Sequence, residues 1–347
     1  MKQRAVVVAP GRGTYNKAEL GTLARHHADK SQILQQFDAY RSEQGQEPIS
    51  ALDGAERFSI AKHTRGDNAS PLIYACAYFD FLSIAQDRFD VVGITGNSMG
   101  WYIALACAGA LDSADGLRLV NTMGSLMQES LIGGQLIYPF VDENWQSLPG
   151  ARENILTKVS EIDARADHQL TQSIDLGGML VLAGDEAGLA AFEAEMPAVQ
   201  DRFPMRLPNH AAFHSALQAP VAEKGRALLE PALFAQPRTP LIDGRGAIWN
   251  PKACDLNSLW DYTLGHQVVE TYDFTAAIRT AARELMPDVF IVLGPGTTLG
   301  GAVAQSLTQC NWRGWESKSD FQKAQTSTPR LLSMGMEEQR KIVVNTR

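Results

Sequence analysis

Short apolar runs alternate with longer helical stretches along most of this chain. Residues 4–9, 90–95 and 288–293 are compact runs rich in β-branched side chains, which is typical of strands buried in a parallel sheet. Residues 71–84 are apolar almost all round, and residues 98–109 are apolar and rich in alanine, so both are expected to be helices packed against that sheet. This alternation of strands and helices predicts an α/β fold.

The pattern changes character near residue 131. Strand-like and helix-like stretches follow one another at residues 133–138, 144–159, 178–184, 185–195 and 203–207. This order indicates a small α+β insert of the ferredoxin-like kind. The sequence therefore predicts a large domain from residues 1–130 and 208–310, a small domain from residues 131–207, and a polar C-terminal tail from residues 311–347 without an assigned role.

Composition limits the classes of function. The chain has 347 residues, of which 45% are hydrophobic and 20% charged, as in soluble globular proteins. No apolar stretch is long enough for a membrane span, and the first residues do not resemble a signal peptide, so a cytoplasmic protein is expected. A net charge of −8 argues against a nucleic-acid-binding surface. The four widely spaced cysteines indicate neither a disulfide framework nor a metal site, and no tightly bound cofactor is expected.

A Gly-x-Ser-x-Gly pattern follows the strand at residues 90–95 directly. Ser98 is expected at a sharp turn, flanked by Gly96 and Gly100, with a helix starting beside it. Free N–H groups at a helix start lie where a tetrahedral oxyanion would form. The alternative interpretation is a tight strand–helix connection with no chemical role.

A serine nucleophile needs a base within hydrogen-bond reach. Of the seven histidines, four lie in polar stretches, which leaves His210, His214 and His266. An α/β-hydrolase would require an acid between the serine and a late histidine. Asp243 and His266 run in that order and form a competing hypothesis.

Four stretches match a known set of motifs in order: residues 10–14 (Pro-Gly-Arg-Gly-Thr), 96–102 (Gly-Asn-Ser-Met-Gly-Trp-Tyr), 212–220 (Ala-Phe-His-Ser-Ala-Leu-Gln-Ala-Pro) and 292–299 (Val-Leu-Gly-Pro-Gly-Thr-Thr-Leu). Together they resemble the malonyl-CoA:acyl-carrier-protein transacylase family, which includes the acyltransferase domains of fatty-acid and polyketide synthases. The resemblance covers about residues 5 to 308. It implies a large α/β-hydrolase-like domain with a parallel sheet and a small inserted ferredoxin-like subdomain.

The resemblance also implies roles for individual residues. Ser98 would be the nucleophile and His214 the general base, with His210 as the less favoured candidate. A backbone carbonyl near the Gly-Pro-Gly loop at residues 294–296 would orient the histidine, as in the family. The main-chain N–H groups of Arg12 and Met99 would form the oxyanion hole, in which one donor is typically worth about 3–4 kcal/mol in the transition state.

The chain departs from the family pattern at the acyl end of the site. The arginine that pairs with the malonate carboxylate in the family corresponds to Met123, and losing such a charge-assisted pair costs roughly 1.5–3 kcal/mol. Trp101 and Asn97 replace a glutamate and a histidine, whereas Phe213 retains a residue typical of malonyl-transferring members. We therefore expect a preference for neutral acyl groups. The competing expectation is that Arg12 receives a carboxylate from the opposite wall.

These residues favour an acyltransferase that moves an acyl group from acyl-CoA, through an acyl-Ser98 intermediate, to the phosphopantetheine thiol of an acyl carrier protein. Its expected partners are therefore acyl-CoA and that carrier, both as substrates. An editing thioesterase would use the same serine and histidine but release the acyl group to water. A third hypothesis is a non-catalytic relative that only docks partners.

Overall fold

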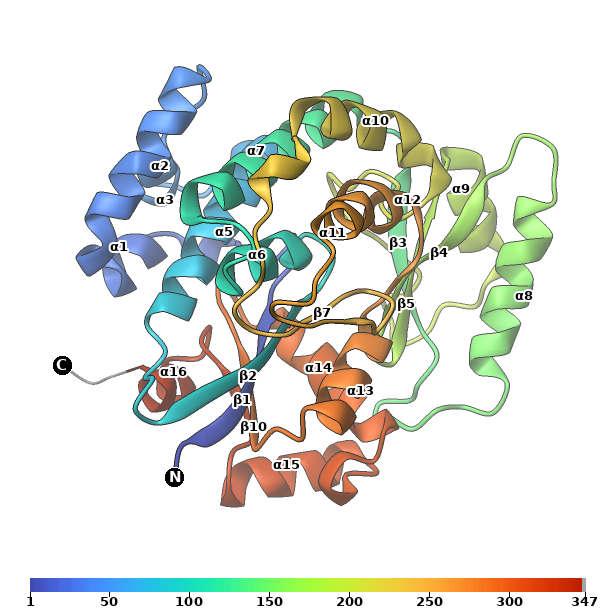
Figure 1. Ribbon diagram of the computed structural model, residues 1–347. Helices are drawn as coiled ribbons and strands as arrows, with labels where there is room; N and C mark the ends of the chain where they lie inside the picture. Colours follow the sequence, from blue (N-terminus) through green and yellow to red (C-terminus); the bar gives the residue numbers. More distant parts are fainter. Residues whose placement is uncertain (345–347) are drawn as a thin grey trace.

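The computed structural model describes residues 1–344 and arranges them around two sheets that stand side by side (Figure 1). The larger sheet has six strands in the order β11-β10-β1-β2-β7-β8. Its first five strands pair in parallel, and β8 pairs antiparallel with β7 at one edge. The strands are β1 Gln3–Ala9, β2 Phe89–Gly96, β7 Leu241–Ile242, β8 Ile248–Trp249, β10 Val289–Val292 and β11 Leu331–Ser333.

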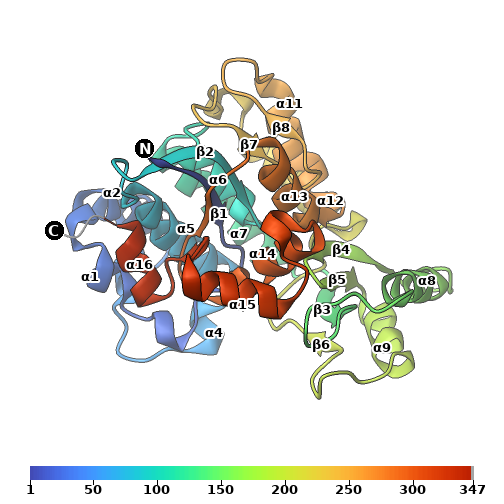
Figure 2. The ribbon, with the colours of Figure 1, turned by 90° about the horizontal axis from the view of Figure 1, so that it is seen from below.

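Helices cover both faces of the larger sheet, with α5 on one side and α13 and α14 on the other (Figure 2). Ala5 to Ala9 in β1 are completely buried between these layers, which explains their continuous apolar run. The helices around this sheet are α5 Gly66–Leu82, α6 Gly100–Cys107, α7 Ser113–Ser130, α10 Ala219–Leu228, α11 Leu256–Asp261, α12 Gln267–Val269, α13 Phe274–Glu284 and α14 Thr298–Gln309. The parallel sheet places the loops after β1, β2 and β10 at one edge, where ligands bind in open α/β sheets.

The smaller sheet has ferredoxin-like topology. Its elements follow the order strand, helix, two strands, helix and strand: β3 Gly134–Pro139, α8 Ala151–Asp163, β4 Leu170–Leu176, β5 Met179–Gly184, α9 Glu186–Glu195 and β6 Met205–Arg206. The neighbouring pairs of these four strands are antiparallel. The α/β fold class with a small ferredoxin-like subdomain is therefore confirmed.

Two features of the smaller sheet differ from the sequence prediction. The pattern at residues 131–207 gave no strand between residues 159 and 178, yet β4 lies there and pairs with β5 through a tight hairpin. The apolar pattern did not reveal β4, because two of its buried residues, Ser173 and Asp175, are polar and make hydrogen bonds. A fifth strand, β9 Tyr272–Asp273, comes from the returning chain and pairs parallel with β4. This strand ties the two sheets together.

Residues 311–344 of the predicted C-terminal tail belong to the larger domain, and residues 345–347 lie outside the described residues. Strand β11 extends the larger sheet beside β10, and helix α16 Glu337–Val343 packs next to α1 Thr22–His26 and α5 (Figure 2). Arg340 in α16 pairs with the buried Asp80 in α5 at 2.5 Å. The prediction of a separate tail from residue 311 was wrong because a strand of only three residues, Leu331–Ser333, forms the sheet edge in an otherwise polar stretch.

The remaining helices lie at the edges of the larger domain. Residues 17–65 form several short helices. They include α2 Ser31–Glu43, α3 Ile49–Asp53 and α4 Ile60–His63, and α15 Lys318–Ser327 precedes β11.

Candidate active site

Ser98 lies on a sharp turn between a buried strand and a helix. Strand β2 ends at Gly96 and α6 begins at Gly100, and Ser98 has a φ angle of 56°, in the left-handed region. That conformation is strained for a side-chain-bearing residue and persists only where the surroundings impose it. A Cβ on Gly96 would lie 2.2 Å from the Gly100 carbonyl carbon, and a Cβ on Gly100 would lie 2.3 Å from the Ala9 carbonyl oxygen. The turn therefore requires both glycines of the motif.

His214 is the histidine that the structure places beside this serine. Its Nε2 lies 2.8 Å from Ser98 Oγ, and its Nδ1 lies 2.6 Å from the main-chain carbonyl oxygen of Gln267. A carbonyl oxygen only accepts, so Nδ1 carries the proton and Nε2 offers its lone pair to the serine hydroxyl. This tautomer is the one that can take the serine proton.

Burial keeps the His214 ring neutral. Loss of solvent around the ring lowers the pKa of His214 to about 4, and the hydrogen bond to Gln267 opposes that shift only in part. The ring packs against Tyr272 with the ring centroids 5.3 Å apart, and the Tyr272 hydroxyl donates to the Gly96 carbonyl at 2.6 Å. One aromatic side chain of β9 therefore contacts both the histidine and the strand end that carries the serine.

Gln267 is a site residue that the sequence gave no reason to select. Its side-chain amide donates to the Ser98 carbonyl at 3.1 Å and accepts from the Tyr102 hydroxyl at 2.9 Å, while its main-chain carbonyl holds His214. It directly follows a π-helical turn, Tyr262–His266, an irregularity that is frequent at functional sites. The expectation that a carbonyl near residues 294–296 orients the histidine is therefore corrected, because Gln267 supplies that carbonyl.

His210 is directed to a different partner. Its Nδ1 lies 2.9 Å from the side-chain oxygen of Gln135 in β3, and burial together with the charge of Arg12 lowers the pKa of His210 to about 3. Gln135 also donates to Ser173 Oγ at 2.7 Å, and Ser173 Oγ donates to the Phe213 carbonyl at 2.8 Å. This network fixes the residue before His214 to the smaller sheet, so the two sheets jointly position the histidine.

The loop after β1 lies against the serine turn. A Cβ on Gly11 would lie 2.6 Å from the Asn97 carbonyl oxygen, so only a glycine permits this approach. Arg12 and Met99 both line the cavity at Ser98, and no hydrogen bond within residues 1–344 uses the main-chain N–H of either. Two free N–H groups beside the nucleophile are what an oxyanion hole requires. Their role as oxyanion donors stays a prediction.

A small, mostly apolar cavity of about 20 Å³ lies directly beside Ser98 and His214. Met123 in α7 is only 1% exposed and forms part of its wall, together with Val120, Met127 and Val268. A cavity of ~10–15 Å³ on this measure holds a single water molecule. The space next to Met123 therefore accepts a group of about methyl size.

A much larger cleft of about 830 Å³ reaches Ser98 from the other side. Side chains from both sheets line it, including Phe58, Ile137, Ile174, Met179, Leu207 and Leu299. Asn97 also lines this cleft, and its side-chain oxygen is buried without a hydrogen-bond partner. Arg12, Ser98 and Phe213 line both the cleft and the small cavity, so these three side chains lie where the two spaces meet.

Trp101 does not reach either space. Its side chain is completely buried, donates from Nε1 to Thr263 Oγ1 at 3.0 Å and packs edge-on against Tyr262. The prediction that Trp101 contacts substrate was wrong because its position on α6 faces the 262–266 turn. The other predicted site residues, Ser98, His214, Arg12, Met99, Met123, Asn97 and Phe213, all line one of the two spaces.

The competing pair Asp243 and His266 is not joined to Ser98. Asp243 is completely buried and accepts hydrogen bonds from the Arg245 side chain at 2.6 Å and from Trp249 Nε1 at 3.0 Å. His266 lines a separate cavity together with Arg245 and Tyr262. The geometry therefore favours the pairing with His214 over an Asp243–His266 arrangement.

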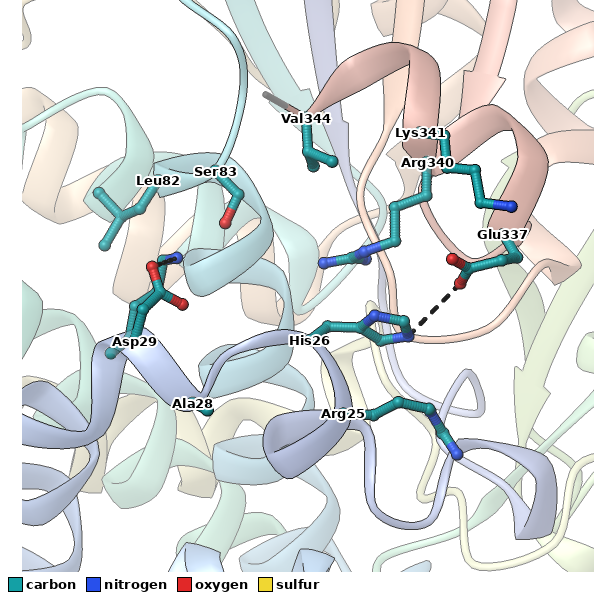
Figure 3. A pocket seen from close by; sticks show the side chains of 11 residues that line it. Arg25, His26, Ala28, Asp29, Leu82, Ser83, Glu337, Arg340, Lys341 and Val344 are labelled. Atoms are coloured by element: carbon teal, nitrogen blue, oxygen red, sulfur yellow. Dashed lines mark hydrogen bonds and ion pairs between the residues drawn. The ribbon is translucent and has the colours of Figure 1, made fainter. Parts of the chain in front are cut away.

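Another cavity, of about 520 Å³, lies between α1 and α16 and shares no lining residue with the spaces at Ser98 (Figure 3). It contains a serine and a histidine, but Ser83 Oγ donates to the Phe79 carbonyl, and His26 faces Glu337 at 3.8 Å. No nucleophile and base are paired there. Within residues 1–344 no cluster of His, Cys, Asp and Glu is arranged to hold a metal ion, and none of the helices described there is long and apolar enough to span a membrane.

Solved structures of similar fold belong to one group of enzymes. The malonyl-CoA:ACP transacylase of Synechocystis superposes with a TM-score of 0.73 at 18% identity, over 99% of this chain and 100% of that one. A malonyl-transacylase described in complex with a type II polyketide synthase acyl-carrier protein superposes with a TM-score of 0.69 at 21% identity, over 88% of this chain and 93% of that one. Both likenesses concern the fold.

Sequence relatives carry the same description, whereas no sequence model of a protein family matches the chain. The malonyl CoA-acyl carrier protein transacylase of Salmonella typhimurium is 25% identical over 208 residues, which are 60% of this chain and 63% of that enzyme. The one from Bacillus subtilis is 26% identical over 232 residues, which are 62% of this chain and 67% of that enzyme. In its fold and in the motifs at Ser98 and His214, the chain is therefore similar to the malonyl-CoA:acyl-carrier-protein transacylases.

Proposed function

We propose that this protein is an acyltransferase that carries an acyl group on Ser98 between two thioesters. The observation that carries this proposal is the contact between Ser98 Oγ and His214 Nε2 at 2.8 Å, with the histidine tautomer fixed by Gln267. A serine hydroxyl becomes an effective nucleophile when a neutral base accepts its proton, and the low pKa of His214 keeps that base neutral at physiological pH. The family likeness supports thioesters as the substrates.

The first half of the proposed reaction forms an ester on the serine. Ser98 Oγ attacks the thioester carbonyl carbon while His214 Nε2 takes the hydroxyl proton. The main-chain N–H groups of Arg12 and Met99 would receive the oxyanion. The carbon–sulfur bond then breaks, His214 gives its proton to the departing thiolate, and the acyl group remains on Ser98.

The second half returns the acyl group to a new thiol. The incoming thiol gives its proton to His214, attacks the Ser98 ester and leaves as a thioester, while the serine regains its proton from His214. The large cleft that reaches Ser98 gives a pantetheine arm access to the site. We propose acyl-CoA as the donor and a phosphopantetheinylated acyl carrier protein as the acceptor, because a fold relative is described in complex with such a carrier.

We further propose that the acyl group is not held as in the malonyl-transferring relatives. Position 123, an arginine in their motif, is a buried methionine in the wall of a space of about 20 Å³. A carboxylate entering that space would lose its hydration without gaining a charged partner, which is unfavourable. A distal group larger than methyl must therefore turn toward the side where Arg12 and Phe213 meet the cleft.

The test is transfer to a purified holo acyl carrier protein, followed by intact mass measurement of the carrier with malonyl-CoA and acetyl-CoA as separate donors. The expected result is an acylated carrier with wild-type enzyme and an unchanged carrier with Ser98→Ala. Apo carrier, which lacks the thiol, is the matched control. Release of free acid and CoA at the same rate with and without the carrier would instead support the thioesterase hypothesis.

A further inference from the structure

We infer that Arg12 is the receptor for a carboxylate at the distal end of the acyl group, taking the place of the arginine missing at position 123. The inference rests on the proposed acyl transfer at Ser98 and specifies the substrate class of that site: acyl groups that end in a free carboxylate. It relocates the charge from helix α7 to the loop after β1. The main-chain N–H of Arg12 and its side chain would then serve different parts of the same substrate.

The first observation is that the guanidinium has no carboxylate partner. No Asp or Glu oxygen within residues 1–344 forms an ion pair with Arg12. One terminal nitrogen donates to the main-chain carbonyls of Thr64 at 2.9 Å and Asn209 at 3.1 Å. The Nε is shielded from solvent and has no hydrogen-bond partner. A partly buried cation with a shielded, unused N–H gains when an anion joins it.

The second observation is the position of this side chain. Arg12 lines both the small cavity and the large cleft at Ser98, and its guanidinium carbon lies 5.6 Å from the centre of the Phe213 ring. An acyl group on Ser98 therefore extends past Arg12 if it does not enter the small space beside Met123. A planar guanidinium whose orientation is fixed by two carbonyls is suited to hold a carboxylate.

The third observation concerns the surroundings of the charge. Burial lowers the pKa of Arg12 to about 10, and the charge of Asp67 offsets this only in part. The guanidinium still carries its proton at physiological pH. The neighbouring His210 is kept neutral by burial and by the charge of Arg12, so Arg12 is the cation of this pair. The attraction for an incoming carboxylate therefore comes from the Arg12 charge itself.

Gly66, which has no Cβ, leaves room for the Arg12 side chain. A Cβ on Gly66, at the start of α5, would lie 3.5 Å from an Arg12 terminal nitrogen and 2.8 Å from the Gly124 carbonyl oxygen. Helices α5 and α7 therefore pack closely at this point, and the Arg12 guanidinium lies beside Gly66. Its direction is set by this packing and by the Thr64 and Asn209 carbonyls, which hold it at the site instead of in solvent.

The test is the ratio of kcat/KM for malonyl-CoA to kcat/KM for acetyl-CoA, measured with the full-length protein and a holo carrier. We expect the wild-type enzyme to prefer malonyl-CoA and Arg12→Gln to lower the ratio on the order of 10- to 100-fold, the range for loss of a charge-assisted pair. Arg12→Lys should retain part of the preference, because it keeps the charge but not the planar fork. Lys17→Gln, which removes another cation of the same cleft, is the matched control and should leave the ratio within about twofold.

A binding measurement keeps the test independent of turnover. In the Ser98→Ala background, malonyl-CoA should raise the melting temperature more than acetyl-CoA, and adding Arg12→Gln should abolish that difference. A wild-type preference for acetyl-CoA, or a malonyl preference that survives Arg12→Gln, would overturn the assignment. Failure of the proposed function gives a different result, since no acyl-CoA would then label Ser98 in the wild-type enzyme.

Discussion

The half of the site that holds the reacting groups and the half that would hold the acyl group differ in how their polar groups are paired. Around Ser98 and His214 the polar groups are paired: the serine with the histidine, the histidine with the Gln267 carbonyl, and the Gln267 side chain with Ser98 and Tyr102. On the acyl side, Arg12 Nε and Asn97 Oδ1 are buried without partners. Buried polar groups are usually satisfied, so each exception calls for an explanation.

This difference in pairing links the first half to catalysis and the second half to selection of the acyl group. A fully paired arrangement is preorganised and holds the nucleophile and base in reacting geometry before substrate arrives. Unpaired groups gain most when a ligand satisfies them, and they lose most when an ill-matched ligand leaves them buried. Changes in the paired half should therefore affect all acyl groups alike, whereas changes in the unpaired half should alter the preference among them.

The largest effect is expected from Ser98→Ala. Acyl transfer and covalent labelling should both disappear with every donor, because Ser98 carries the hydroxyl that hydrogen-bonds to His214 Nε2. The rate of carrier acylation measures the first effect and intact protein mass the second. Transfer at near wild-type rate in this variant would contradict the covalent mechanism.

His214→Ala should slow transfer by a factor on the order of 10² to 10⁴ for malonyl and acetyl donors alike, as expected for loss of a general base. His266→Ala is the matched control, since His266 lines a separate cavity and not the spaces at Ser98. Steady-state kinetics of both variants decide the assignment. A larger loss in His210→Ala or His266→Ala than in His214→Ala would show that the base has been misassigned.

The pH dependence of kcat/KM should distinguish the buried His214 from an ordinary exposed histidine. Because burial lowers the pKa of His214 to about 4, the acid limb of kcat/KM for acetyl transfer should have its midpoint near pH 4 and not near the usual value of about 6.5. At pH 5.5 the enzyme should therefore retain most of its rate, whereas a base with a pKa of 6.5 would lose about tenfold. An acid limb centred at pH 6 to 7 would show that His214 is more hydrated than the structure indicates.

The lowered pKa values of His214 and His210 also predict how the free energy of unfolding changes with pH. The folded state disfavours the protonated form of His214 and His210, while the unfolded chain binds protons from about pH 6.5 downward. Their contribution to stability is therefore present above about pH 6.5 and is lost as pH falls toward 4. Denaturant unfolding at pH 7 and pH 5 measures this difference, and a smaller change between the two pH values in a His210→Ala, His214→Ala double variant is the control, because His26 and His266 also have lowered pKa values.

The smallest effect is expected from Met123→Arg. The Met123 sulfur lies against Gly225 in α10, at 2.7 Å from where a Cβ would stand, and the neighbouring Trp101 does not occupy the space. An arginine there should raise the malonyl-to-acetyl ratio several-fold in the Arg12→Gln background, where no other guanidinium competes for the carboxylate. The ratio of kcat/KM values checks this. No gain, with the variant folded by circular dichroism, would show that the wall cannot receive a carboxylate.

The fold and the reacting half follow closely from the sequence. The strand, Gly-x-Ser-x-Gly turn and helix around Ser98 are local features, and the match at His214 required only the chain order of motifs. Gln267 could not be predicted, because its role depends on where a π-helical turn places one carbonyl. Strand β4 and β11 were missed for a related reason: buried hydrogen bonds and edge pairing replace the apolar patterns that reveal strands.

The acyl half shows where sequence reasoning stops. The motifs show that Met123 stands where the family has an arginine, but the direction of the Arg12 side chain depends on the carbonyls of Thr64 and Asn209, far away in sequence. Trp101 lies next to the motif and yet faces the core. Sequence alone therefore left neutral and carboxylated acyl groups as alternatives, and the unpaired guanidinium favours the second.

The central claim is that Ser98 carries the acyl group, and intact mass spectrometry tests it most directly. Wild-type protein mixed briefly with malonyl-CoA or acetyl-CoA, without a carrier, should gain the mass of one acyl group, and peptide mapping should place it on Ser98. Addition of a holo carrier should remove the adduct and transfer the same mass to the carrier. An adduct on another residue, or carrier acylation without any adduct on Ser98, would contradict the account.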